Sequence, residues 1–261
     1  MIYDAAVIIP TTLRASLGRA VRSVFAQTNV GSVQILVGVD VTRGPVELLT
    51  TLREECPPGM DLHIFDPGFS TARHNGGYYP TYAGGSLRTV LSYAANSRYL
   101  AYLDDDNWWA PTHLSDLLQA IEGVDWAYSY RWYVDPATQQ PLCVDQWESV
   151  GPGRGYYRRR FNGFVDTNCL MLDKDKCHWM LPAWCIPLTE RGEGEDRIVF
   201  GKLQAEHTHR CTEKATAYYV FRAADRAVIQ RFMERKNENA GAADAESVNP
   251  PGVPAASEPG R

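Results

Sequence analysis

Short apolar runs alternate with helical patterns in the N-terminal part of the chain, and this alternation constrains the fold more than any other feature. The runs span Ala5–Ile9, Val33–Val39, Leu62–Phe65 and Tyr99–Leu103. Between them, apolar residues recur at the spacing of a helix. Strands that alternate with helices are joined by right-handed crossovers and form a parallel sheet. We therefore predict an α/β fold with a mostly parallel central sheet and helices on both faces.

Three consecutive aspartates, Asp104 to Asp106, follow the fourth predicted strand. Clustered carboxylates repel one another and resist leaving water, so a cation is expected beside them. Mg²⁺ and Mn²⁺ prefer oxygen ligands and typically take one or two protein carboxylates, while a bound diphosphate supplies further ligands. Alternatively, Pro111 opens the next helix and the acids favour its dipole. The triplet by itself leaves both interpretations open.

Polar residues also follow the first two predicted strands, namely Thr11 and Asp40. Ligands bind beyond the carboxyl ends of parallel strands, so we expect these residues and the aspartates to share one edge of the sheet. Asp40 is also compatible with a turn before Thr42 and Arg43. Neither GxGxxG nor GxxxxGK[ST] follows the first strand, so no fingerprint of a dinucleotide site or a P-loop is present.

A second acidic pair, Glu195-Asp196, opens a predicted amphipathic helix. Acids at this position commonly bond to the free N–H groups of the first helical turn. Beside a metal–diphosphate site, one of them instead suits a general base that takes a proton from an attacking hydroxyl. Between Trp126 and Phe161 aromatic residues partly alternate, which is typical of sheet packing, with an acceptor groove as the second interpretation.

The composition argues against several classes of protein. The net charge is −5, from 26 basic and 31 acidic residues, so a nucleic-acid partner is not expected. The six cysteines form no CxxC pair, and neither a zinc site nor a disulfide framework is indicated. No apolar run approaches the roughly 20 residues of a transmembrane helix, and no signal-peptide pattern is present. We therefore expect a soluble, cytoplasmic protein.

Four motifs occur in an order that resembles family-2 glycosyltransferases with the GT-A fold. They are Val7–Thr12, Val37–Asp40, Leu103–Asn107 and Gly194–Arg197. The aspartate motif is especially similar to that of spore-coat polysaccharide glycosyltransferases of this family. The resemblance implies a GT-A-like fold and transfer of a sugar from a nucleotide-diphosphate donor, usually a UDP-sugar. The acceptor would be a saccharide or other hydroxyl compound, the reaction would invert the anomeric centre, and Mn²⁺ or Mg²⁺ would be the cofactor.

The same resemblance implies which residues bind the donor. Thr11 and Asp40 match residues that hold the nucleotide base, and Arg73 matches an arginine near it. Asp105 would contact the ribose, whereas Asp104 would mainly shape the end of the strand.

Metal-binding and catalytic residues are implied in the same way. Asp106 would bind the metal, and His207 and His209 are candidates for a further ligand. Asp166 matches a carboxylate on the acceptor side.

The identity of the base depends on the alignment. The usual Glu-Asp motif favours Asp196, and alignment of Arg197 with the arginine of the family favours Glu195; we favour Asp196. We expect a glycosyltransferase domain over residues 1–236, with a nucleotide-binding half at about 1–110 and an acceptor half at about 111–236. Residues 237–261 lack apolar content and are predicted to be a disordered tail.

Two other functions are alternatives to glycosyl transfer, and the sequence argues against the second. A catalytically inactive nucleotide- or glycan-binding module of the same fold would need the aspartate triplet but not Glu195-Asp196. A nucleotidyltransferase would need a glycine-rich loop with a basic residue after the first strand, and Pro10–Leu13 lacks one.

Overall fold

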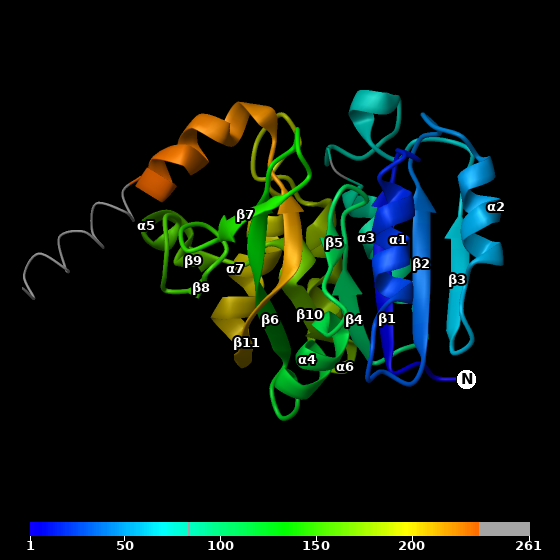
Figure 1. Cartoon of the computed structure of the whole chain (residues 1–261), viewed down its shortest axis with the longest axis horizontal. Helices are drawn as coiled ribbons and strands as arrows, with labels where there is room; N and C mark the ends of the chain where they lie inside the picture. Colours follow the sequence, from blue (N-terminus) through cyan, green and yellow to red (C-terminus); the bar gives the residue numbers. More distant parts are fainter. Residues whose placement is uncertain (83, 235–261) are drawn as a thin grey trace, which may run out of the picture. The chain divides into compact units, whose positions relative to one another are not determined.

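The computed structural model describes residues 1–82 and 84–234 (Figure 1). Met1–Val220 form one compact unit, and a second unit begins at Phe221. In the described part of the second unit, the 3-10 helix η4 (Ala223–Asp225) precedes helical residues 226–234. The predicted tail, residues 237–261, lies outside the described residues.

Four parallel strands form one half of a nine-stranded sheet, in the order β3-β2-β1-β4. They are β1 (Ala5–Thr11), β2 (Val33–Val39), β3 (Met60–Phe65) and β4 (Tyr99–Tyr102). Every residue of β1 and β2 is buried. Strands that are covered on both faces need apolar side chains on both, which explains the uninterrupted apolar runs in the sequence.

The sheet continues beyond β4 with strands from the C-terminal half of the chain. The antiparallel strand β10 (Leu170–Asp173) lies between β4 and β6 (Trp126–Val134). β11 (His209–Val220) pairs in parallel with β6, and β5 (Trp108–Trp109) pairs with β11 at the edge. Strands from both parts of the chain thus form one sheet.

The remaining strands are short. β7 (Pro141–Val144) pairs with β6, and β8 (Gly151–Pro152) forms a separate two-stranded sheet with β9 (Gly163–Phe164). In β6, Trp126, Tyr128 and Tyr133 are buried, as expected from the interpretation of the alternating aromatic residues as sheet packing.

Helices cover both faces of the sheet (Figure 1). On one face lie α1 (Leu17–Phe25), α2 (Glu47–Glu54) and α4 (His113–Ala120). On the other lie α3 (Gly85–Ala94), α6 (Lys174–Cys177), η3 (His178–Cys185) and α7 (Glu195–Glu206). The predicted fold class, α/β with a mostly parallel sheet and helices on both faces, is confirmed. No helix among the described residues is long and apolar enough to cross a bilayer.

The first helix begins at Leu17, although helical periodicity starts at Leu13. Leu13 has a φ of 62°, a conformation uncommon outside glycine, and its N–H donates to Oγ1 of Thr11 at 2.8 Å. This turn lets the chain leave β1 at the edge of the sheet before the helix starts. Local periodicity contains no information about such a turn.

Candidate active site

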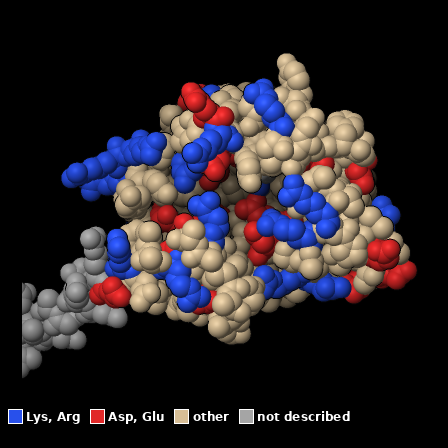
Figure 2. Space-filling model, turned by 90° about the horizontal axis from the view of Figure 1, so that it is seen from above, with Lys and Arg blue, Asp and Glu red and all other residues tan. Residues whose placement is uncertain are grey.

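Thr11, Asp40 and the aspartate triplet meet at one edge of the sheet, as the strand order predicts. The backbone N–H of Asp40 donates to the carbonyl of Thr11 at 2.8 Å. Thr11 Oγ1 donates to Oδ2 of Asp105 at 2.6 Å. Three neighbouring strands thus bring together residues that are far apart in the sequence. Figure 2 shows this face of the molecule with a hollow in which acidic side chains gather and basic side chains surround them.

Asp40 is buried and accepts hydrogen bonds on both carboxylate oxygens. Oδ1 accepts from the N–H and the hydroxyl of Thr71, each at 2.8 Å. Oδ2 accepts from the Ser70 hydroxyl at 2.8 Å and from Asn75 at 3.3 Å. Burial raises the pKa of Asp40, but these hydrogen bonds outweigh burial and hold the pKa below its ordinary value. The carboxylate therefore organises the segment from Ser70 to Asn75.

Arg73 lies within this segment, in the 3-10 helix η1 (Arg73–Asn75). Its side chain is exposed, and Nη2 lies 3.5 Å from the carbonyl of Tyr78. Arg73 is therefore an exposed residue of the segment that bonds to Asp40 through Ser70, Thr71 and Asn75.

The members of the triplet have different surroundings. Asp105 is 1% exposed and bonds to Thr11 and to the guanidinium of Arg14. The side chain of Asp106 is 40% exposed, and its Oδ2 lies 3.0 Å from Nη1 of Arg14. Burial and the neighbouring Asp104 raise the pKa of Asp106 to about 6, although Arg14 opposes the shift. Asp106 is thus the most exposed carboxylate of the triplet, ahead of Asp104, whose side chain is 29% exposed.

Asp104 connects the triplet to the second acidic pair. Its carboxylate bonds to the buried guanidinium of Arg88, a residue of α3. Nη1 of Arg88 also lies 3.7 Å from Oε1 of Glu195, the first residue of α7. One buried cation therefore stands between the two acidic clusters, and the structure brings Glu195 and Asp196 to the same edge as the triplet.

Glu195 and Asp196 differ in exposure. Glu195 is 5% exposed, and burial raises its pKa to about 7 although Arg88 opposes the shift. The side chain of Asp196 is 28% exposed, and its Oδ1 accepts from the backbone N–H of Arg197 at 2.8 Å. Burial also raises the pKa of Asp196, with Arg197 opposing and Asp166 adding to the shift. A raised pKa brings a carboxylate closer to the value that suits a general base near neutral pH.

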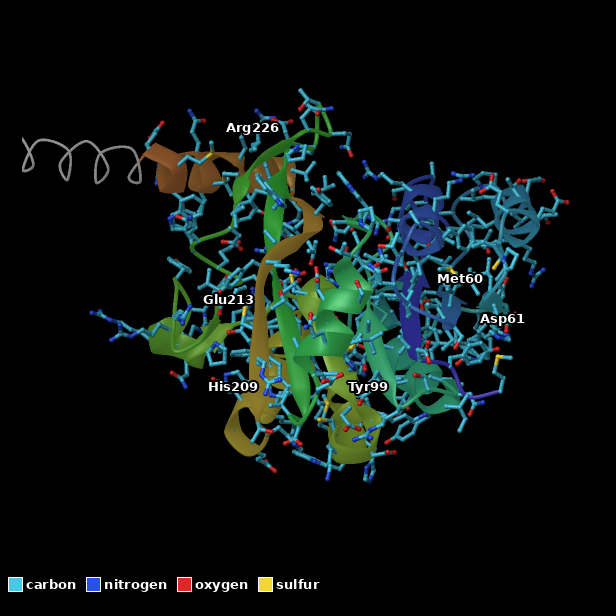
Figure 3. The ribbon with its side chains drawn as sticks, turned by 60° about the horizontal axis from the view of Figure 1, so that its bottom comes forward. Met60, Asp61, Tyr99, His209, Glu213 and Arg226 are labelled. Carbon is cyan, nitrogen blue, oxygen red and sulfur yellow. The ribbon has the colours of Figure 1, made fainter. Side chains whose placement is uncertain are left out.

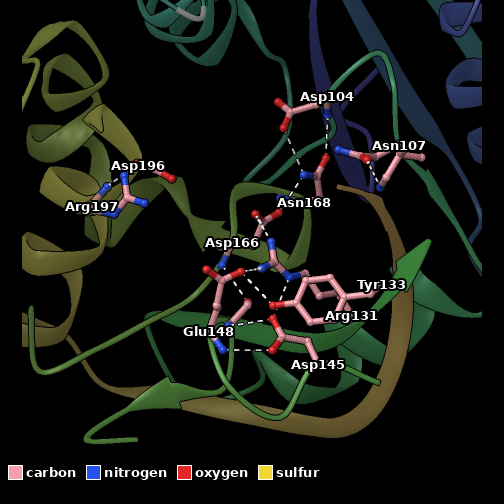
Figure 4. Close-up of polar contacts among 12 residues, drawn as sticks. Asp104, Asn107, Arg131, Tyr133, Asp145, Glu148, Asp166, Asn168, Asp196 and Arg197 are labelled. Carbon is pink, nitrogen blue, oxygen red and sulfur yellow. Dashed lines mark hydrogen bonds and ion pairs between the residues drawn. The ribbon is translucent and has the colours of Figure 1, made fainter. Parts of the chain in front are cut away.

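Asp166 is buried, and both of its carboxylate oxygens are occupied. Oδ2 lies 2.6 Å from Nη1 of Arg131, and Oδ1 accepts from the N–H and the side-chain amide of Asn168, at 2.9 and 2.7 Å. Figure 4 shows these contacts beside Asp104 and Asp196. Asp166 is therefore part of the site, but within a hydrogen-bonded network.

His207 and His209 lie away from the aspartate triplet, Asp104–Asp106. His209 pairs with Trp126 at the start of β6, and His207 contacts Asp125 at 3.4 Å and Trp179 at 3.1 Å. Because β11 runs parallel to β6 and β6 runs in the same direction as β4, the start of β11 lies opposite the edge that holds the aspartates. Figure 3 shows His209 and Tyr99 at the ends where β11 and β4 begin. The prediction that these histidines are metal ligands is corrected accordingly.

Asp106 offers the most exposed carboxylate of the triplet for a metal ion. Among residues 1–82 and 84–234, no three His, Cys, Asp or Glu side chains are grouped to hold a metal. A divalent ion shared with a diphosphate needs only one or two protein carboxylates, and Asp106 is one that is 40% exposed. Burial and the neighbouring acids raise the pKa of Asp106, and Arg14 opposes the shift; a metal ion would favour the ionised carboxylate as Arg14 does. The Asp106 carboxylate therefore suits an ion that takes its other ligands from a phosphate-bearing molecule and from water. It does not suit an ion held by protein side chains alone.

Four residues of the site were not predicted from the sequence, namely Arg14, Arg88, Arg131 and Asn168. Arg88 falls within an apolar helical pattern, and Arg131 falls within an aromatic strand. An arginine at an otherwise apolar position signals a buried partner of opposite charge, since an unpaired buried charge is very costly. The sequence does not indicate which acid that partner is.

Comparisons with known proteins identify the fold. No protein-family model matches the chain, and no curated protein is significantly similar to it in sequence. Among solved structures, S. aureus TarS matches with a TM-score of 0.61 and 13% identity, over 84% of this chain and 37% of TarS. TarS 1-349 in complex with UDP-GlcNAc matches with a TM-score of 0.61 and 12% identity, over 84% of this chain and 59% of that one. TarS 1-349 in complex with UDP matches with a TM-score of 0.59 and 13% identity, over 84% of this chain and 60% of that one.

This chain spans between 37% and 60% of the length of these solved chains. At such low sequence identity, the similarity concerns the fold. The chain thus has the fold of S. aureus TarS, which is the GT-A-like architecture predicted from the sequence.

Proposed function

We propose that this chain is a glycosyltransferase that transfers a sugar from a nucleotide-diphosphate donor, most simply a UDP-sugar, to a hydroxyl of an acceptor. The observation that carries the proposal is the meeting of two acidic clusters at one edge of the sheet, with Arg88 between Asp104 and Glu195. The fold supports it, because TarS, which shares the fold, has been solved with UDP and with UDP-GlcNAc.

The donor would bind across the ends of β1, β2 and β4. Asp40 would act on the nucleotide base together with the Ser70–Asn75 segment that it organises, and Arg73 would lie at the rim of that subsite. Asp105, held by Thr11 and Arg14, would face the ribose. Asp106 would hold Mn²⁺ or Mg²⁺. When bound, the metal would neutralise the charge that develops on the leaving diphosphate.

Transfer would need one base and no enzymic nucleophile. The acceptor oxygen forms a bond to the anomeric carbon while the bond from that carbon to the diphosphate oxygen breaks and its electron pair leaves with the diphosphate. The hydroxyl proton passes to the base, and a single displacement inverts the anomeric centre. Asp196 is better placed than Glu195 for this role, because its side chain is 28% exposed whereas Glu195 is buried against Arg88.

A thermal-shift panel of UDP, UDP-GlcNAc, GDP and ADP, each with and without Mn²⁺, tests the donor and the metal. We expect a uridine nucleotide to raise the melting temperature more when Mn²⁺ is present, because a ligand that binds only the native state stabilises it. No shift with any nucleotide would contradict the proposal. Uridine binding without donor hydrolysis or transfer would favour the inactive binding module. A relation to the spore-coat enzymes remains a prediction from the aspartate motif.

A further inference from the structure

A buried network connects the donor side of the site to its acceptor side, and Asn168 is at its centre. Asn168 is 0% exposed. Its side-chain amide nitrogen donates to Oδ2 of Asp104 at 3.0 Å and to Oδ1 of Asp166 at 2.7 Å. Its Oδ1 accepts from the backbone N–H of Asp104 at 2.7 Å. The side chain of Asn168 thus holds both the backbone and the carboxylate of the first aspartate in the triplet (Figure 4).

Backbone contacts fix Asn168 itself. Its N–H donates to Oδ1 of Asp166 at 2.9 Å, and its carbonyl accepts from the indole N–H of Trp109 at 2.8 Å. Every polar group of Asn168 therefore has a partner within the described chain. A fully satisfied buried network of this kind is rigid, whereas a partly satisfied one is costly.

Arg131 fixes the other end of the network. Its side chain is 3% exposed and contacts Asp145 at 2.8 Å, Asp166 at 2.6 Å and Glu148 at 3.0 Å. Asp145 is oriented in turn by the backbone N–H groups of residues 147–149, at 2.8 to 2.9 Å. These acids would repel one another without the guanidinium, and its planar fork reaches all three at once. A lysine ammonium in this position would not match that geometry.

We propose that Asn168 and Arg131 are positioning residues that lock the Asp104–Asp106 turn to the acceptor side of the site. Arg131 holds Asp166, Asp166 orients Asn168, and Asn168 holds Asp104 next to the two carboxylates that bind the donor. This inference rests on the proposed function for its effect on donor binding. The geometry of the lock does not depend on that function. Asp166 acts through this network, and none of its oxygens is required to touch the acceptor.

The test compares Asn168→Ser, Asn168→Asp and Arg131→Lys with two control variants. Arg98→Lys alters a similar pair, since Arg98 contacts the buried Asp173 at 2.6 Å, but at the strand-start edge away from the aspartates. Asn29→Asp changes an exposed asparagine in the loop before β2, also at that edge. Asn168→Asp places a third carboxylate between two others and is the variant most at risk of unfolding. Asn168→Ser is neutral and smaller, and it keeps the test valid if the aspartate variant does not fold.

Two measurements are made on each folded variant. Amide hydrogen exchange of the segment containing Asp104–Asn107 reports on the lock itself, and titration with UDP in the presence of Mn²⁺ reports on donor binding. We expect faster exchange in Asn168→Ser and Arg131→Lys, and UDP affinity in the presence of Mn²⁺ about 10–100-fold weaker, the range for loss of a residue that orients the ligands of a metal site. Both control variants should lose no UDP affinity, even where Arg98→Lys lowers the melting temperature as much as Arg131→Lys does.

The outcomes separate this inference from the proposed function. Unchanged exchange at Asp104–Asn107 together with UDP affinity within about twofold of the wild type, the error expected for independent sites, would overturn the lock. Equal losses in Arg98→Lys and Arg131→Lys would also overturn it, because the effect would then be one of general stability. Faster exchange in the Asn168 and Arg131 variants of a protein that binds no UDP would support the lock and contradict the proposed function.

Discussion

Nη1 of Arg88 lies 3.7 Å from Oε1 of Glu195, and both side chains are almost fully buried. A buried carboxylate is stabilised by such a neighbour, yet burial prevails here and the pKa of Glu195 is raised to about 7. Near neutral pH, the charge at the start of α7 therefore changes with small changes in pH.

This relationship predicts how stability depends on pH. Between pH 4.5, the ordinary pKa, and about 7, the unfolded chain releases the Glu195 proton that the native protein retains. The native protein then binds more protons than the unfolded chain, so the free energy of unfolding falls as the pH rises through this window. We expect Glu195→Gln to reduce that fall, as measured by urea unfolding from pH 4.5 to 7.5. If the free energy of unfolding fell equally with pH in Glu195→Gln and in the wild type, the raised pKa of Glu195 would be contradicted.

Asp106→Asn should abolish the dependence of UDP binding on Mn²⁺ while the fold is retained. The side chain is 40% exposed and lies among other acids, so loss of its charge removes repulsion without leaving a buried group unpaired. The affinity for UDP is measured by titration with and without Mn²⁺, in the wild type and in Asp106→Asn. Asp175→Asn, at a side chain that is 74% exposed on α6, is the matched control. Metal-dependent binding that persists in Asp106→Asn would remove Asp106 from the metal site.

Asp196→Asn should retain UDP affinity and lose transfer by about 10²–10⁴-fold, the range for removal of a general base. The amide keeps the size of the carboxylate, so the donor site is not disturbed. Initial rates of UDP release from UDP-GlcNAc measure the loss of transfer. A titration with UDP measures whether the affinity is retained. Full activity in Asp196→Asn would transfer the role to Glu195, or to Asp166, which would contradict the positioning role inferred for Asp166.

Asp40→Asn should destabilise the Ser70–Asn75 segment and weaken UDP binding. An amide nitrogen cannot accept the hydrogen bonds that one carboxylate oxygen of Asp40 now accepts, so buried donors lose their partner. We expect a loss of about 1–3 kcal/mol in the free energy of unfolding, measured with urea at neutral pH. Ser70→Ala removes only one of these hydrogen bonds and should have a smaller effect. Equal stability of Asp40→Asn and wild type would show that this segment does not depend on Asp40.

The placement of the residues that we propose bind the donor was largely predictable from the sequence. The apolar runs define β1, β2 and β4, and the parallel order of these strands places Thr11, Asp40 and Asp104–Asp106 at one edge. The acceptor side was less predictable. Asp166 was expected to face the acceptor, yet its oxygens are occupied by Arg131 and Asn168. His207 and His209 were candidates for a further metal ligand, and the parallel pairing of β11 with β6 places them at the opposite edge.

The sequence by itself determined the α/β fold and the presence of two acidic clusters, because strand and helix periodicity and strand-end position are local properties. Only the tertiary structure decided which groups face those acids. Arg88 lies between Asp104 and Glu195 because α3 and α7 lie on the same face of the sheet, next to η3. Asn168 reaches Asp104 because β10 enters the sheet between β4 and β6. A buried charge or amide takes its partners from whichever elements pack around it, and those contacts are long-range.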